Sequence, residues 1–164
     1  EILKRVPDAT LKIVGHGPEG ERLKRLVHSL SLQPKVAFAG TTPTYESVAR
    51  YFKESALFVL PSHVQGESIA AKEAMAASLP VVAVTIAGSG VLSIVEDGVN
   101  GFLVEPARPS MLAERIVELL QDDGKSRAMG AAGRRFVQEF DWRVVADRTL
   151  QVYTQVTGDA RFTR

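Results

Sequence analysis

The chain has 164 residues, 45% of them hydrophobic and 24% charged, which suffices for one globular domain with a sizeable core. Its formal net charge of +1 argues against the basic surface of a nucleic-acid-binding protein, so we expect no nucleic-acid partner. The absence of cysteine excludes disulfides and thiolate metal sites. The histidines His16, His28 and His63 lack the spacing of metal ligands, and no apolar run approaches the ~20 residues of a membrane helix.

The beginning of the chain leads to two expectations. Glu1–Arg5 does not have the composition of a signal peptide, so we expect a cytoplasmic protein. The sequence begins without methionine and inside an apparent helix end, so we also expect a fragment of a longer protein. Any association with a membrane is then expected only through that parent protein.

Helical and strand patterns alternate along the chain. In chain order they predict a helix end at Glu1–Val6, a strand at Leu11–Val14, a helix around Leu23 to Leu30, a strand at Val36–Gly40 and a helix at Tyr45–Glu54. Next come a strand at Ala56–Leu60, a helix at Glu67–Ala77, a strand at Pro80–Val84, a short helix at Val91–Glu96 and a strand at Phe102–Val104. The chain closes with helices at Ser110–Leu120, at residues 125–140 and after the capping residue Asp141.

Near-continuous apolar strands separated by helices predict a doubly wound α/β fold, with a parallel sheet covered on both faces. We expect one domain over residues 1–156 and a frayed tail over residues 157–164. The last helix carries an apolar stripe, formed by Val145, Thr149, Val152 and Val156.

The turn after the first strand is rich in glycine. Gly15-His16-Gly17-Pro18-Glu19-Gly20 matches the G-x-G-x-x-G pattern of dinucleotide sites. Such sites also need an acidic residue where the next strand ends, and that strand ends Phe38-Ala39-Gly40, so an NAD-type oxidoreductase is disfavoured. Two readings stay open: a turn that lets a ligand approach Gly15, His16 and Gly17, or a plain tight turn between strand and helix.

A polar loop follows the third strand and leads into an alanine-rich helix. Free backbone amides at a helix start suit phosphate, and loops at the carboxyl ends of parallel strands bind ligands in open α/β sheets. Glu73 shares a helix face with Ile69 and Ala77, and a carboxylate on such a face needs a partner, either a ligand diol or a protein donor. The pattern predicts a site for a phosphorylated ligand with hydroxyls, although Glu67 and Ser68 also suit simple capping.

Six segments, in this order, carry a family resemblance: Leu11–Pro18, Val36–Gly40, Phe58–Ser62, Glu73–Ala76, Pro80–Ala83 and Glu96–Val104. Through them the chain resembles the C-terminal, donor-binding half of a GT-B glycosyltransferase of family four (group one). The resemblance implies a Rossmann-like domain that binds a nucleotide diphosphate sugar, linked to UDP or GDP. It also implies transfer to an acceptor with retention of anomeric configuration, and no cofactor or metal.

The resemblance also implies roles for single residues. Glu73 would hold the ribose hydroxyls, the helix start from Gly66 to Ile69 would face the diphosphate and sugar, and backbone near Thr41 and Thr42 would contact the base. The expected nucleotide-sugar-binding residues are Gly15, His16, Gly17, Thr41, Thr42, Gln65, Gly66, Glu67, Ser68, Ile69 and Glu73.

The chain departs from the family pattern in its signature loop. Without a gap, Gln65 takes the place of the first signature glutamate; with a two-residue deletion, Glu67 and Ser68 begin a version that has lost Phe-Gly. Ser93 replaces the glutamate of a later Gly-Gly-x-x-Glu loop. These departures leave open a degenerate, non-catalytic scaffold or interaction domain.

By the same resemblance, the Arg and Lys that clamp the diphosphate, the acceptor-binding domain and the first strand of the sheet lie upstream of Glu1. In the strand order 3-2-1-4-5-6 the first strand is central, so we expect a hole between Leu11–Val14 and Ala56–Leu60. Unpaired backbone at such a hole is costly, so the sheet is expected to close to order 3-2-4-5-6 or to borrow a strand from another chain.

Overall fold

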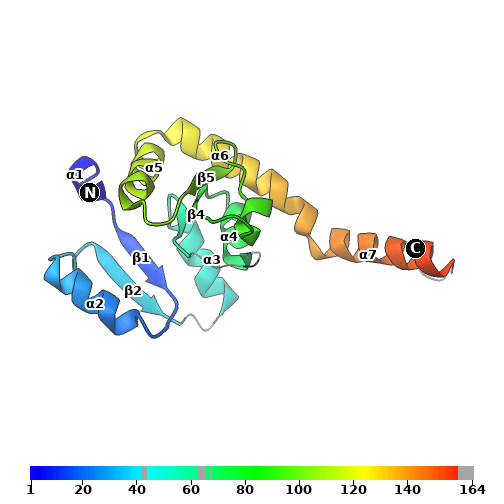
Figure 1. The fold of residues 1–164 in the computed structure, drawn as a ribbon, viewed down its shortest axis with the longest axis horizontal. Coiled ribbons are helices and arrows are strands. Elements are labelled where there is room, and N and C mark those ends of the chain that lie inside the picture. Colours follow the sequence, from blue (N-terminus) through cyan, green and yellow to red (C-terminus); the bar gives the residue numbers. More distant parts are fainter. Residues whose placement is uncertain (42–43, 63–65, 67, 159–164) are drawn as a thin grey trace.

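A computed structural model of the chain describes residues 1–41, 44–62, 66 and 68–158 (Figure 1). Its strands are β1 (Leu11–Val14), β2 (Val36–Gly40), β3 (Phe58–Leu60), β4 (Val81–Val84) and β5 (Gly101–Val104). Its α-helices are α1 (Ile2–Arg5), α2 (Gly20–Ser29), α3 (Tyr45–Lys53), α4 (Ile69–Ala76), α5 (Pro109–Gln121), α6 (Asp123–Val137) and α7 (Trp142–Thr157). Two 3₁₀ turns complete the described elements, η1 (Gly90–Ser93) and η2 (Gln138–Phe140).

The predicted alternation of strands and helices is confirmed, with differences at the element ends. The third strand begins at Phe58 rather than Ala56, and the helix predicted over Val91–Glu96 is the single 3₁₀ turn η1. The helix predicted over residues 125–140 begins at Asp123, where the Asp122 side chain accepts a hydrogen bond from the Lys125 amide, and ends at Val137. The Asp122 cap accounts for the start of that helix, and the 3₁₀ turn η2 follows its end.

The strands form two parallel sheets. One has the order β1–β2 and the other the order β3–β4–β5, and within the described residues no strand pairing joins β1 to β3. The interruption lies where the hole was predicted, whereas closure into a single five-stranded sheet is wrong. Leu11 and Val14 of β1 are 48% and 44% exposed, although parallel strands are normally buried on both faces.

Side chains from helices connect the two sheets. The Lys12 ammonium of β1 lies 3.0 Å from the carboxylate of Glu54, the residue that caps the end of α3. From the same helix, Phe52 packs edge-on against Phe58 of β3, with ring centroids 5.8 Å apart. The position of β1 and β2 relative to β3 therefore depends on α3.

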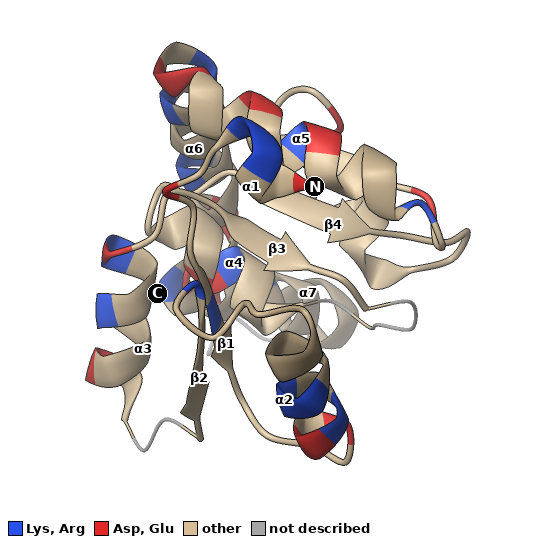
Figure 2. Cartoon of the chain, turned by 90° about the vertical axis from the view of Figure 1, so that its left-hand side faces the viewer, with Lys and Arg blue, Asp and Glu red and all other residues tan. Residues whose placement is uncertain are grey.

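The core lies on the two faces of the β3–β4–β5 sheet. Val81 and Ala83 of β4 pack on one face against α4, while Val82 packs on the other with Leu119 of α5 and Met129 of α6. All four residues of β4 are buried, as expected for a central parallel strand. The strands of this sheet, β3, β4 and β5, carry no charged residue, whereas basic and acidic side chains are neighbours on α2 (Figure 2).

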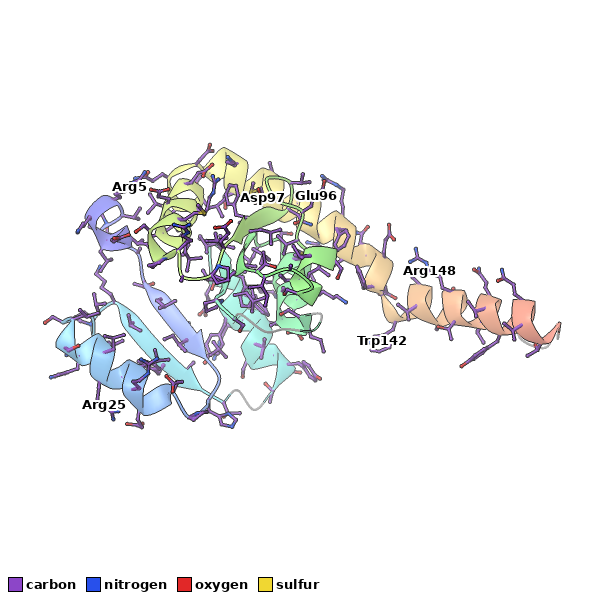
Figure 3. The ribbon with its side chains drawn as sticks, in the orientation of Figure 1. Arg5, Arg25, Glu96, Asp97, Trp142 and Arg148 are labelled. Atoms are coloured by element: carbon purple, nitrogen blue, oxygen red, sulfur yellow. The ribbon has the colours of Figure 1, made fainter. Side chains whose placement is uncertain are left out.

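A buried asparagine holds the turn before β5. The Oδ1 of Asn100 accepts a hydrogen bond from the Glu96 amide at 2.9 Å, and its Nδ2 donates to the Ile94 carbonyl at 3.1 Å. Asp97 lies in the same turn beside Glu96 (Figure 3), and its Oδ1 accepts from the amide of Leu103 at 2.8 Å. Residues Asp97 and Asn100 of the segment Glu96–Val104 therefore stabilise the turn before β5.

Helix α7 extends away from the rest of the domain (Figure 1). Its predicted stripe is exposed, with Val152 and Val156 at 54% and 79%. Thr157 is the last residue of α7 and Gly158 follows it in the left-handed conformation, while residues 159–164 of the predicted tail lie outside the described part. No helix among the described residues has the length and apolarity needed to cross a membrane.

Candidate functional site

Two glycine turns meet at the carboxyl ends of β1 and β2. Gly15 has φ +122° and Gly40 has φ +65°, backbone conformations that favour glycine. The amide of Gly15 donates to the Gly40 carbonyl at 2.8 Å, so the two turns are held together. Gly17 accepts from the amide of Gly20 at 3.0 Å, and α2 begins there.

A side-chain hydrogen bond joins the same two turns. The Nδ1 atom of His16 lies 2.9 Å from the Oγ1 atom of Thr41, and both side chains are exposed. The structure thus brings together His16 and Thr41, two residues that the sequence placed in separate loops. Thr42, the other residue expected near the base, lies outside the described part.

The second candidate region lies at the start of α4. Ser68 is the N-cap, and its Oγ accepts a hydrogen bond from the Ala71 amide at 3.2 Å. The capping role considered for Ser68 is confirmed. The first amides of a helix have no intrahelical acceptor, so those of Ile69 and Ala70 point out of the helix start. Gly66 is exposed and Ile69 is 73% exposed, while Gln65, Glu67 and His63 lie outside the described residues.

Glu73 lies one turn further along α4. It is half-buried, whereas its helix neighbours Ala71, Ala74 and Met75 are fully buried against the sheet. Among the described residues, no hydrogen bond or ion pair of the Glu73 carboxylate is found. The carboxylate is therefore available to accept hydrogen bonds from a ligand.

A hollow at the carboxyl ends of the strands could not be predicted from the sequence. A hollow of about 170 Å³ lies there, lined by Pro61, Val84, Glu105, Ala107, Arg108, Pro109 and Leu112. The guanidinium of Arg108 lies 3.6 Å from the carboxylate of Glu105. The only sequence signal for Arg108 is its position just after a predicted strand, which many surface residues share.

Other candidate residues have structural roles. His28 lies on the exposed side of α2, and its Nδ1 is 2.6 Å from Nε2 of Gln33. The Ser93 hydroxyl donates to the Gly90 carbonyl at 2.7 Å, which closes the turn η1 locally. Within the described ranges, no three His, Asp or Glu side chains are grouped closely enough to hold a metal ion.

Residues 1–136 match the family described as "Glycosyl transferases group 1". The chain is 32% identical, over 98% of its length, to a D-inositol 3-phosphate glycosyltransferase of Corynebacterium diphtheriae. It is 29% identical, over 92% of its length, to an uncharacterized glycosyltransferase of Methanocaldococcus jannaschii. The chain spans 37% of the first relative and 42% of the second.

Solved structures of other proteins superpose on this chain. Sucrose-phosphate synthase of Thermosynechococcus elongatus superposes with a TM-score of 0.82 at 30% identity, covering 96% of this chain and 41% of that one. HepE of Anabaena, solved with UDP-glucose, superposes with a TM-score of 0.76 at 22% identity, covering 96% and 44%, which supports the fold alone. With 136 of 164 residues matched, the chain belongs to the group 1 glycosyl transferases.

Proposed function

We propose that residues 1–156 form the domain of a retaining glycosyltransferase that binds the nucleotide diphosphate sugar, linked to UDP or GDP. The sugar would pass to an acceptor held by another part of a longer parent protein. The chain spans about two-fifths of its curated relatives, at 37% and 42%, which leaves room for such a part. The cytoplasmic location expected from the composition belongs to the same proposal.

The half-buried Glu73 carboxylate carries the proposal. A carboxylate removed from bulk water needs donors, and the described residues supply none. The two hydroxyls of a ribose are suitable donors, because a hydrogen bond to a charged acceptor is stronger than one between neutral groups.

The start of α4 supplies the second element of the proposed site. The amides of Ile69 and Ala70 point out of the helix, where they can donate to phosphate oxygens, and the helix dipole favours negative charge there. A diphosphate at this position would bring its ribose near the first two turns of α4, which include Glu73. Gln65 and Glu67 would complete this loop.

The proposed reaction needs no metal from this domain. The helix start and the Arg and Lys expected upstream would together stabilise the charge that develops on the leaving diphosphate. The role of this domain is therefore to bind the donor and to orient it toward the acceptor. By itself the domain is expected to bind donor weakly and to transfer no sugar.

Nucleotide binding by the intact parent protein tests the proposal. Calorimetric titration with UDP, GDP and NAD should give binding of UDP or GDP and none of NAD. Glu73→Gln should weaken nucleotide binding by about 1.5–3 kcal/mol, because the amide loses the charge-assisted hydrogen bonds to the ribose. Glu114→Gln, at an exposed position on α5, is the matched control and should leave binding unchanged.

Three outcomes would contradict the proposal. Binding of NAD alone would revive the dinucleotide reading of the turn after β1. A folded protein that binds none of the three nucleotides would favour the scaffold alternative raised by Gln65 and Ser93. Equal affinities of Glu73→Gln and the unmodified protein would refute the role of Glu73.

A further inference from the structure

Helix α4 packs against α6 and against the turn η2 that follows α6. The two segments run in opposite directions. Just after the end of α4, Ser78 lies against Gly130 of α6, and one turn earlier Met75 lies against Gly133. These close approaches hold the second half of α4, whereas the proposed nucleotide site lies at its first half.

A cation–π contact joins the first half of α4 to η2. The Nζ atom of Lys72 lies 4.0 Å from the ring centroid of Phe140, and both side chains are half-buried. The ring of Phe140 packs against the core cluster that contains the buried side of α4, with its centroid 5.4 Å from that of Phe136. An ammonium is attracted to the negative face of an aromatic ring, and removal from water strengthens this attraction. Lys72 therefore ties α4 to η2.

The position of Lys72 in α4 relates it to both elements of the proposed site. Lys72 directly precedes Glu73, and the amides of Ile69 and Ala70 belong to the turn before it. Adjacent side chains of an α-helix point about 100° apart around its axis. A contact that fixes the rotation of α4 at Lys72 therefore also fixes the direction of the Glu73 carboxylate.

We propose that the contact between Lys72 and Phe140 orients the first two turns of α4 for the nucleotide. The amides at the helix start and the Glu73 carboxylate can then meet the diphosphate and the ribose at the same time. Lys72 is thus a positioning residue, which acts through α4 and does not itself bind the nucleotide. This role depends on the proposed function, because it concerns the same site.

Matched variants separate this role from a purely structural one. Lys72→Met keeps the apolar stem and removes the charge, while Phe140→Leu removes the ring. Lys72→Arg and Phe140→Tyr each retain a cation over a ring. Lys125→Met is the control, because Nζ of Lys125 lies 5.2 Å from the ring centroid of Phe102, on the face of the sheet opposite α4. Lys125 also donates to Glu118, so this variant loses stabilising contacts far from the proposed site.

The test is a titration of the intact protein and these variants with UDP, GDP and the 2′-deoxy forms of both. Lys72→Met and Phe140→Leu should each lower the affinity for the preferred nucleotide by about 3- to 10-fold, within the strength of one cation–π contact. They should lower the affinity for its 2′-deoxy form less, because that form already lacks one hydroxyl that Glu73 would bind. Lys72→Arg and Phe140→Tyr should retain both affinities. The double variant Lys72→Met/Phe140→Leu should lose no more affinity than either single variant.

The control and the ratio of the two affinities decide between the roles. Lys125→Met should unfold at a lower urea concentration and keep both affinities. If the ratio of affinities for the nucleotide and its 2′-deoxy form is unchanged in Lys72→Met and Phe140→Leu, the positioning role is overturned while the proposed function stands. If the unmodified protein binds neither UDP nor GDP, the proposed function itself fails, and the positioning role fails with it.

Discussion

A Cβ atom added at Gly130 of α6 would lie 1.9 Å from the carbonyl oxygen of Ser78, just after α4. The glycine lets α6 contact the end of α4 at backbone distance, and a Cβ atom at Gly133 would lie 3.0 Å from the side chain of Met75. Because α4 carries Glu73, the packing of α6 helps to set the position of the carboxylate that we propose binds the ribose.

Gly130→Ala should destabilise the protein by about 1–3 kcal/mol or more, since backbone atoms must move to admit the methyl group. Urea unfolding measures the change. Gly20→Ala is the control, because a Cβ there would meet open space and alanine favours helices. If both variants unfold at the same urea concentration, the close approach is wrong.

Asn100→Ala should lower the free energy of unfolding by about 2–4 kcal/mol, because it leaves the Glu96 amide and the Ile94 carbonyl without their partner. Asn100→Asp keeps the acceptor but places a buried carboxylate oxygen against the Ile94 carbonyl, so at neutral pH it should destabilise the protein at least as much as Asn100→Ala. Thermal unfolding compares the three proteins. An Asn100→Ala variant as stable as the unmodified protein would contradict the role of the buried hydrogen bonds.

Glu118 makes the stability depend on pH. The hydrogen bond from Lys125 is the main cause that lowers the pKa of the Glu118 carboxyl in the folded protein, with a further bond from Arg115 at 2.9 Å. A lowered pKa gives stability that is present above the unfolded value, about 4.3 for glutamate, and is lost as the pH falls through the folded value.

Glu118→Gln should therefore destabilise the protein at pH 7. In this variant the free energy of unfolding should also decrease less as the pH falls from neutral to acidic. The effect should be less than about 1 kcal/mol, because the pair is partly exposed. Urea unfolding at several pH values is the measurement, with Glu114→Gln as the exposed control on the same helix. A pH profile identical to that of the unmodified protein would rule out the contribution of Glu118.

The open edges of β1 and β3 should make the isolated 164-residue chain less stable than a form with a strand between them. An upstream extension of about 35 residues, the length of a strand and its crossover helix, should raise the urea midpoint. An equally long extension with glycine and proline in place of the apolar residues is the control. Equal midpoints for all three proteins would mean that no strand belongs in the interruption.

Gln65→Glu, or insertion of Phe-Gly after Ser68, should increase donor affinity or transfer activity in the intact protein. Either change restores one alignment of the family signature, and a carboxylate or a longer loop there would contact the sugar in place of the present residues. Donor titration and an activity assay measure the gain. If neither variant gains, the signature loop has lost its role in this chain.

The fold was largely predictable, because apolar runs and glycine turns are local signals. The strand Val81–Val84 could be predicted as buried from its four apolar residues alone. The contact of His16 with Thr41 could not, since it depends on a bulge between strands that are distant in the sequence. The apolar stripe of α7 could be predicted at Val152 and Val156, but its exposure could not. A periodic pattern shows which face of a helix is apolar and does not show which surface packs against that face.

Helix α7 also determines what an optical measurement of this protein reports. Trp142 is the only tryptophan of the chain, stands at the first position of α7 and is 85% exposed (Figure 3). Its fluorescence should already resemble that of a tryptophan in water while the core is intact, so unfolding of the core would change its emission little. A shift of that emission to shorter wavelength would instead report that another surface has covered the beginning of α7.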